Sequence, residues 1–144
     1  MLSLGREEEA EKELLKSLEI DPAQPSAHRA LGGLRVRQER FEQAESSLAA
    51  AARLEAESSA AHLALARVQE KLGKLEDAVT SYEKAIDIDP QIWEAYLKMA
   101  RILDLYLGEP ERAAAILQRY LDRSGPDPDQ VKALLKNLPT RSRP

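Results

Sequence analysis

The chain has 144 residues, of which 43% are hydrophobic, 32% are charged and only 4% are aromatic, and its net charge is −4 at pH 7. This composition predicts one globular unit and excludes a disordered chain, and the negative charge argues against nucleic acid or an anionic membrane as a partner. The absence of cysteine excludes disulfides, thiolate zinc sites and cysteine nucleophiles. No apolar run approaches the ~20 residues of a membrane span, and the chain shows no signal-peptide pattern, so we favour the cytoplasm.

The first expected helix covers Leu4–Ile20 and ends before Pro22. A hairpin of two helices follows, at about Ser26–Gln38 and Glu42–Leu54. Ser26 is the expected N-cap of its first helix, because a serine hydroxyl can accept a backbone N–H there. The turn between the two helices contains Glu39 and no glycine, so we expect it to be strained or unusual in shape.

The clearest hairpin lies in residues 59–90. Apolar residues recur there every three or four positions, which predicts two helices of about Ala60–Leu72 and Glu76–Ile88. Gly73 between them can adopt the left-handed conformation that ends a helix. Pro90 cannot continue the second helix, because it lacks a backbone N–H and its ring clashes with the preceding turn.

The last expected hairpin joins Trp93–Leu107 to about Pro110–Arg123. Asp89 and Pro90 are its expected N-cap and first-turn proline. The spacing of the pattern is one residue too long at this point, which predicts an extra residue in the first helix or its turn, such as a bulge.

After a break at residues 124–128, a final helix of about Asp129–Leu138 is expected, with Asp127 as N-cap and Pro128 in its first turn. We expect its apolar stripe to cover the last hairpin, and residues 139–144 to be disordered. The stripe consists of Val131, Leu134, Leu135 and Leu138.

Similar residues recur along the chain every 34 positions, as in His28 and His62 or in Ala10, Ala44 and Ala78. A helix–turn–helix unit with this period is typical of the tetratricopeptide repeat, and the chain resembles that family. In residues 59–92 the signature positions are His62, Leu65, Ala66, Gly73, Leu75, Ala78, Tyr82, Ala85 and Pro90. In residues 25–58 they are His28, Leu31, Gly32, Glu39, Phe41, Ala44, Leu48, Ala51 and Ala56.

The resemblance implies an all-α fold, a right-handed α-solenoid of helix hairpins with a C-terminal capping helix. We expect a single domain over residues 1–138, with a partial repeat at 4–24, full repeats at 25–58, 59–92 and 93–126, and the cap at 129–138. Gly5 takes the turn position of the partial repeat, whose first helix would lie before Met1. We therefore expect the chain to be a fragment of a longer protein.

The resemblance also implies that the first helices line a concave groove that binds a protein partner, either a peptide or a helix. Arg67 and Arg101 lie 34 positions apart, so we expect them to stand side by side on adjacent first helices. Such a pair of guanidinium groups would suit an acidic ligand. The alternative is internal pairing of these arginines with Glu70 and Asp104. Carried over position by position, the candidate groove residues are Arg29, Gly33, Leu63, Arg67, Glu70, Leu97, Lys98, Arg101 and Asp104.

One subclass of the family clamps the carboxylate tail of heat-shock chaperones with lysines and asparagines at defined positions. This chain has Arg29, Gly33, Ala64, Glu94 and Lys98 there, so most of the clamp is missing and we expect no such binding.

We predict no catalytic residue, cofactor or metal site, because phosphate loops, nucleophile elbows and zinc motifs are missing from the sequence. His28 and His62 share one repeat position and are interpreted as packing residues. The leading hypothesis is a protein-interaction module or scaffold. The alternatives are self-assembly through the repeat ends, giving a homo-oligomer through the open N-terminal end, and the docking arm of a larger enzyme.

Overall fold

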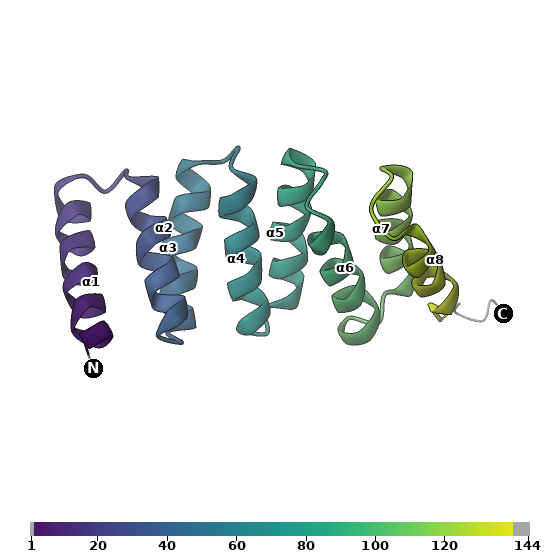
Figure 1. Ribbon diagram of the computed structural model, residues 1–144, viewed down its shortest axis with the longest axis horizontal. Coiled ribbons are helices and arrows are strands. Elements are labelled where there is room, and N and C mark those ends of the chain that lie inside the picture. Colours follow the sequence, from purple (N-terminus) through teal and green to yellow (C-terminus); the bar gives the residue numbers. More distant parts are fainter. Residues whose placement is uncertain (1, 140–144) are drawn as a thin grey trace.

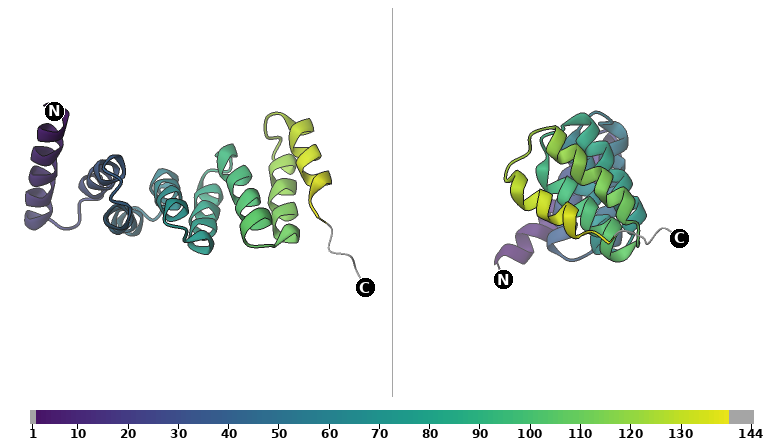
Figure 2. Two further views of the ribbon diagram at one scale, coloured as in Figure 1. Left: turned by 90° about the horizontal axis from the view of Figure 1, so that it is seen from below. Right: turned by 90° about the vertical axis from the view of Figure 1, so that its right-hand side faces the viewer.

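The computed structural model describes residues 2–139, which form an elongated row of antiparallel helices with the two termini at opposite ends (Figures 1 and 2). This arrangement confirms the expected all-α solenoid of helix hairpins. The expected disordered tail lies outside the described residues from 140 onward. The helices are α1 (Leu2–Ile20), α2 (Pro25–Arg37), α3 (Phe41–Leu54), α4 (Ser59–Lys71), α5 (Leu75–Ile88), α6 (Trp93–Arg101), the π-helical turn η1 (Ile102–Tyr106), α7 (Pro110–Asp122) and α8 (Pro128–Asn137).

Small residues set the contact between the two helices of each hairpin. Ala44, Ala78 and Ala113 occupy the same place in α3, α5 and α7, and all three are fully buried. At Gly32 in α2, a Cβ atom would lie only 2.6 Å from the Leu48 side chain of α3. Helices with such small residues in contact approach closely, and a larger side chain there would have to displace its neighbour.

The largest part of the core lies in the C-terminal half of the row. Tyr82, Tyr96 and Met99 are completely buried there, and they belong to one cluster that extends from α4 to α8. A smaller cluster around Leu48 and Val68 joins α3 to α4. Burial of this apolar surface against neighbouring repeats is the main force that holds the row together.

A side-chain donor at the same position of each full repeat reaches back to the loop before its own hairpin. His28 Nε2 lies 2.8 Å from the Pro22 carbonyl, and His62 Nε2 lies 2.9 Å from the Ala56 carbonyl. The Tyr96 hydroxyl donates to the Pro90 carbonyl over 3.0 Å. Both histidines therefore bond the loop that joins their repeat to the one before it.

The turns between helices follow the expected chemistry where glycine is present. Gly73 has a φ of +74°, which ends α4 in the left-handed conformation, and Gly108 has a φ of +64°. Glu39 takes this conformation without being glycine, with a φ of 57°. The expectation of a strained turn after α2 is therefore confirmed, at a cost of about 1 kcal/mol.

Three expectations about the helix ends are wrong. Gly5 lies inside α1 rather than in a turn. Gln24 rather than Ser26 is the N-cap of α2, since Pro25 occupies its first position. The Gln24 side chain instead donates to the carbonyls of Ser17 and Asp21, over 2.9 and 3.0 Å, and so ties α2 to the end of α1.

The third error concerns Asp89 and Pro90, which lie in the turn before α6 and do not cap it. The Asp89 carboxylate accepts the Gln91 N–H over 3.0 Å, and this local turn delays the helix. α6 begins at Trp93, with Ile92 as its N-cap.

The expected extra residue in the last hairpin is present as the π-helical turn η1. The Leu107 N–H donates to the Ile102 carbonyl over 3.0 Å, five residues earlier. Asp127 is the N-cap of α8 as expected, but it has a left-handed φ of 51° and its side chain makes no capping hydrogen bond. α8 packs on α7, and its Val131 is buried.

The repeat-joining hydrogen bonds can be tested by Tyr96→Phe. Tyr96 is completely buried, so loss of its hydroxyl leaves the Pro90 carbonyl without this donor. We expect the free energy of unfolding to fall by about 1 kcal/mol, measured by urea denaturation. Tyr106→Phe, at a tyrosine that is 61% exposed, is the matched control. Equal midpoints for the two variants would contradict a joining role for the bond.

Candidate binding cleft

A cleft of about 660 Å³ lies between α6 with η1 on one side and α8 on the other. α7 forms its floor through Leu117 and Tyr120, and the loop before α8 contributes Pro126 and Asp127. The side chains along its walls are mostly apolar. They include Trp93, Leu97, Ala100, Leu105, Val131, Leu134 and Leu138.

Three leucines that line this cleft are more exposed than is usual for leucine. Leu97 is 37% exposed, Leu134 is 47% exposed and Leu105 is 68% exposed. Leu105 belongs to η1, the turn that contains the extra residue. Exposed apolar side chains that gather in a concave place mark a surface that another molecule can cover.

Aromatic rings close the end of the cleft near Trp93. The Trp93 and Tyr120 ring centroids lie 5.1 Å apart in an edge-to-face arrangement, and Tyr96 packs against both rings. Tyr120 stands where the other repeats have alanine, and Gly125 leaves room for its ring, since a Cβ on Gly125 would overlap it. Burial raises the pKa of the Tyr120 hydroxyl, which donates to the Pro126 carbonyl.

Most charged side chains of the groove are paired between first helices of neighbouring repeats. Arg67 of α4 forms an ion pair with Glu94 of α6. Glu70 accepts the Tyr82 hydroxyl over 2.8 Å and lies 3.7 Å from the Lys98 ammonium. Arg67 is therefore paired, but with the first helix of the next repeat and not with Glu70. Burial and the Glu70 hydrogen bond raise the pKa of Tyr82.

Arg101 and Asp104 make no ion pair within residues 2–139, with each other or with another side chain. Both line the cleft, and Arg101 is exposed. Of the two arginines that we expected to bind an acidic ligand, only Arg101 has a guanidinium without an ion pair in the described residues.

The structure brings together three of the candidate groove residues in this cleft, namely Leu97, Arg101 and Asp104. The others lie elsewhere. Arg29 pairs with Glu55 over 2.9 Å, Leu63 packs against the core, and a Cβ on Gly33 would meet open space. Sequence reasoning missed Leu105 and Leu134 as site residues. The extra residue before Gly108 was the signal that could have identified Leu105.

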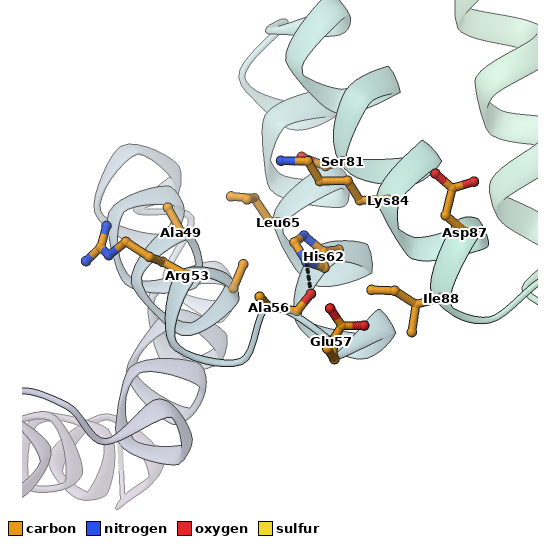
Figure 3. Close-up of a pocket in the computed structure, with 11 residues that line it drawn as sticks. Ala49, Arg53, Ala56, Glu57, His62, Leu65, Ser81, Lys84, Asp87 and Ile88 are labelled. Carbon is orange, nitrogen blue, oxygen red and sulfur yellow. Dashed lines mark hydrogen bonds between the residues drawn. The ribbon is translucent and has the colours of Figure 1, made fainter.

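A second, more polar pocket of about 820 Å³ lies between α3, α4 and α5. Figure 3 shows His62 in its centre, with its hydrogen bond to the Ala56 carbonyl. Charged side chains of both signs surround it, among them Arg53, Glu57, Lys84 and Asp87. Asp87 also accepts from Arg119 over 3.1 Å, so its charge is already matched.

One side of α1 is exposed within the described residues. Ala10 is exposed, although the equivalent Ala44 and Ala78 are fully buried. Glu13 and Ser17 replace residues that are buried in α3 and α5, which makes this face of α1 more polar than its counterparts.

Ion pairs hold a neighbouring side of α1 against the first full repeat. Glu11 accepts from Arg40 over 2.8 Å and from Arg35 over 3.4 Å, and Glu7 lies 3.6 Å from Arg37. The Arg40 hydrogen bond lowers the pKa of Glu11, and Arg35 adds to the effect against the opposing influence of burial.

Within the described residues, no group of histidine and carboxylate side chains could hold a metal ion. In the same part of the chain, no helix has both the length and the apolar character needed to cross a membrane.

Comparison with known families gives one consistent result. Three models of the tetratricopeptide repeat match the chain, at residues 2–24, 29–91 and 73–138. No sequence among the curated proteins matches it.

Among solved structures, the chain is similar to two crystal structures of the protein MamA. The first has a TM-score of 0.72 at 18% identity and covers 93% of this chain and 87% of that chain. The second has a TM-score of 0.72 at 21% identity and covers 97% of this chain and 73% of that chain. At this level of identity the likeness shows a shared fold.

The Glu11 ion pairs predict how acid affects the docking of α1. Because folding lowers the pKa of Glu11 below its ordinary value near 4.5, the pairs stabilise the protein above that pH, and the benefit is lost as pH falls through the lowered pKa. Glu11→Gln should therefore lower the free energy of unfolding by about 1 kcal/mol at pH 7. It should leave the free energy of unfolding unchanged at a pH below the lowered pKa of Glu11. Urea denaturation across this pH range, with the exposed Glu9→Gln as control, checks this. A cost that does not vary with pH would contradict it.

Proposed function

Because the chain belongs to the tetratricopeptide repeat family, we propose that it is a protein-interaction scaffold whose groove binds a segment of a partner protein at the cleft between α6 and α8. Repeat proteins of this kind offer extended concave surfaces, and a row of hairpins is suited to presenting one. The charged side chains near the cleft have no arrangement that supports catalysis, so binding is the activity that we assign to it.

The observation that carries this proposal is the gathering of exposed apolar side chains around a free charge. Leu97, Leu105 and Leu134 all face one cleft, and Arg101 stands beside them without an ion pair in the described part of the chain. Apolar surface supplies most of the binding free energy in a pocket, and a few polar groups fix the orientation of the ligand.

The groove around α2 and α4 is a weaker candidate. Its charges are already matched, since Arg29 pairs with Glu55 and Arg67 with Glu94. Leu63 on α4 is partly buried against the core and presents less apolar surface than the cleft leucines. A ligand there would first have to displace existing pairs, which offsets part of any gain.

The cleft can be tested with a display library of random peptides selected on the whole chain. Leu97→Glu and Leu134→Glu place a charge on the walls at side chains that are already partly exposed, so the fold should tolerate them. We expect the selected peptides to lose at least about tenfold in affinity for either variant, measured by fluorescence anisotropy.

Leu54→Glu is the matched control, because Leu54 of α3 is 41% exposed and lies outside the cleft. Peptides that bind the two cleft variants and the control equally well would show that the cleft is not the binding site.

A second candidate function is self-assembly through the uncovered side of α1. The exposed Ala10 favours it, because this position is buried in every full hairpin. If a second copy covers this side, light scattering at rising concentration should show a dimer, and Ala10→Glu should restore the monomer. A monomer at all concentrations would exclude this candidate. The polar Glu13 and Ser17 on this side make the cleft the stronger proposal.

A further inference from the structure

We propose that the occupant of the cleft is an amphipathic α-helix of a partner protein, about three turns long, with an apolar stripe for the cleft and a carboxylate that pairs with Arg101. This inference rests on the proposed function and adds the conformation and charge of the bound segment.

The walls of the cleft have the form of a seat for a helix. On one side, Trp93, Leu97, Arg101 and Leu105 follow one another at intervals of four residues along α6 and η1. On the other side, Val131 and Leu134 lie three residues apart on α8, and Leu138 follows four residues later at the C-cap. Two such stripes above a floor helix leave the kind of channel into which a further helix packs its own ridges.

The chemistry of the walls favours a helix over an extended peptide. An extended peptide brings unpaired backbone N–H and C=O groups into the cleft, whereas a helix satisfies these groups internally. The walls are helices whose backbone groups are already bonded, and only Gln130 and Asn137 offer side-chain amides on α8. An extended chain would leave several polar groups unpaired next to leucine side chains, at a cost of about 1–3 kcal/mol each.

The length of the occupant follows from the length of the wall. Trp93 and Leu105 mark its two ends along α6 and η1. At 1.5 Å of rise per residue, this stretch is about 18 Å long, which corresponds to a partner helix of about 12 residues. Such a helix presents two or three apolar anchors on one face.

The charges at the rim define one side of the partner helix. Arg101 is exposed and lies one helical turn from both Leu97 and Leu105. A carboxylate on the partner, placed next to its apolar anchors, would form a charge-assisted hydrogen bond with the guanidinium. Asp104 lies nearly one turn further along and repels a second carboxylate, so the partner is expected to carry a neutral or basic residue there.

The π-helical turn contributes the most exposed wall residue. Because η1 inserts one residue into the repeat, it changes the direction of Leu105, which is 68% exposed and lines the cleft. Deletion of Leu105 would restore the regular spacing of the family between α6 and Gly108. It should therefore preserve the fold and remove part of the seat.

The conformation can be tested with two display libraries of about 14 residues that share the same randomised apolar stripe. One has a helix-forming background of alanine, glutamine and lysine, and the other has two central prolines that prevent a helix. We expect binders that Leu134→Glu abolishes only from the first library, with a carboxylate enriched at one position.

Cleft-dependent binders that come equally from the proline library would overturn the helical occupant but leave the proposed function intact. No cleft-dependent binder in the helical library also overturns this inference. The random-peptide selection above decides the proposed function separately.

The charge can be tested on the selected helical peptides. Arg101→Glu should weaken their binding by about tenfold, and a lysine in place of the enriched carboxylate should restore it. Arg53→Glu, the same change at an exposed arginine of α3, should have no effect. Equal losses for the acidic and the lysine peptide would overturn the assignment of Arg101.

Two changes at Leu105 complete the test. Deletion of Leu105 should reduce binding at least about tenfold while circular dichroism and the thermal midpoint stay near those of the natural chain. If the deletion unfolds the protein, Leu105→Gln tests the same side chain without changing the register, because the residue is already exposed. Unchanged binding by the folded variant would exclude Leu105 from the seat.

Discussion

Each full repeat is joined to the repeat before it by a recurring contact, in which a side chain near the start of the hairpin bonds the carbonyl of the preceding loop. Histidine makes this contact at positions 28 and 62, and tyrosine makes it at Tyr96. In each case the partner carbonyl lies six residues earlier. The bond gives the carbonyl at the junction of two repeats a partner within the protein.

The cleft forms because the last repeat differs from the two earlier full repeats in two places. η1 turns Leu105 outward, and Tyr120 places a buried ring where the earlier repeats have a buried alanine. The ring needs the space that Gly125 leaves, and it supports Trp93 at the end of the cleft. The last repeat keeps the small Ala113 at the contact between its two helices, but it has a large ring where the earlier repeats have Ala51 and Ala85.

The sequence predicted the helices well, because their apolar spacing reports directly on which side is buried. Most helix ends agree to within one or two residues, and the extra residue before Gly108 was visible as a change of spacing. The caps were harder to predict, since several donors compete for the same groups. Ser26 had the right chemistry for a cap, but Pro25 occupies the first position of α2, so the N-cap is Gln24, two residues before Ser26. The ion-pair partner of Arg67 could not be predicted from the sequence either, because Glu70 and Glu94 are both chemically suitable. Only the spacing between α4 and α6 selects Glu94.

The pairing of Arg67 with Glu94 affects which charged partners the groove can bind. Where charges on adjacent first helices satisfy one another, as Arg67 and Glu94 do, the surface offers little to an incoming charge. Arg101 makes no such ion pair in the described part of the chain, and α8 presents the amides Gln130 and Asn137 to the cleft. The apolar walls can attract many amphipathic segments, whereas a single unpaired guanidinium favours those with a carboxylate in register. Affinity would then come mainly from the leucines, and orientation from Arg101, so added salt should weaken selectivity more than total binding.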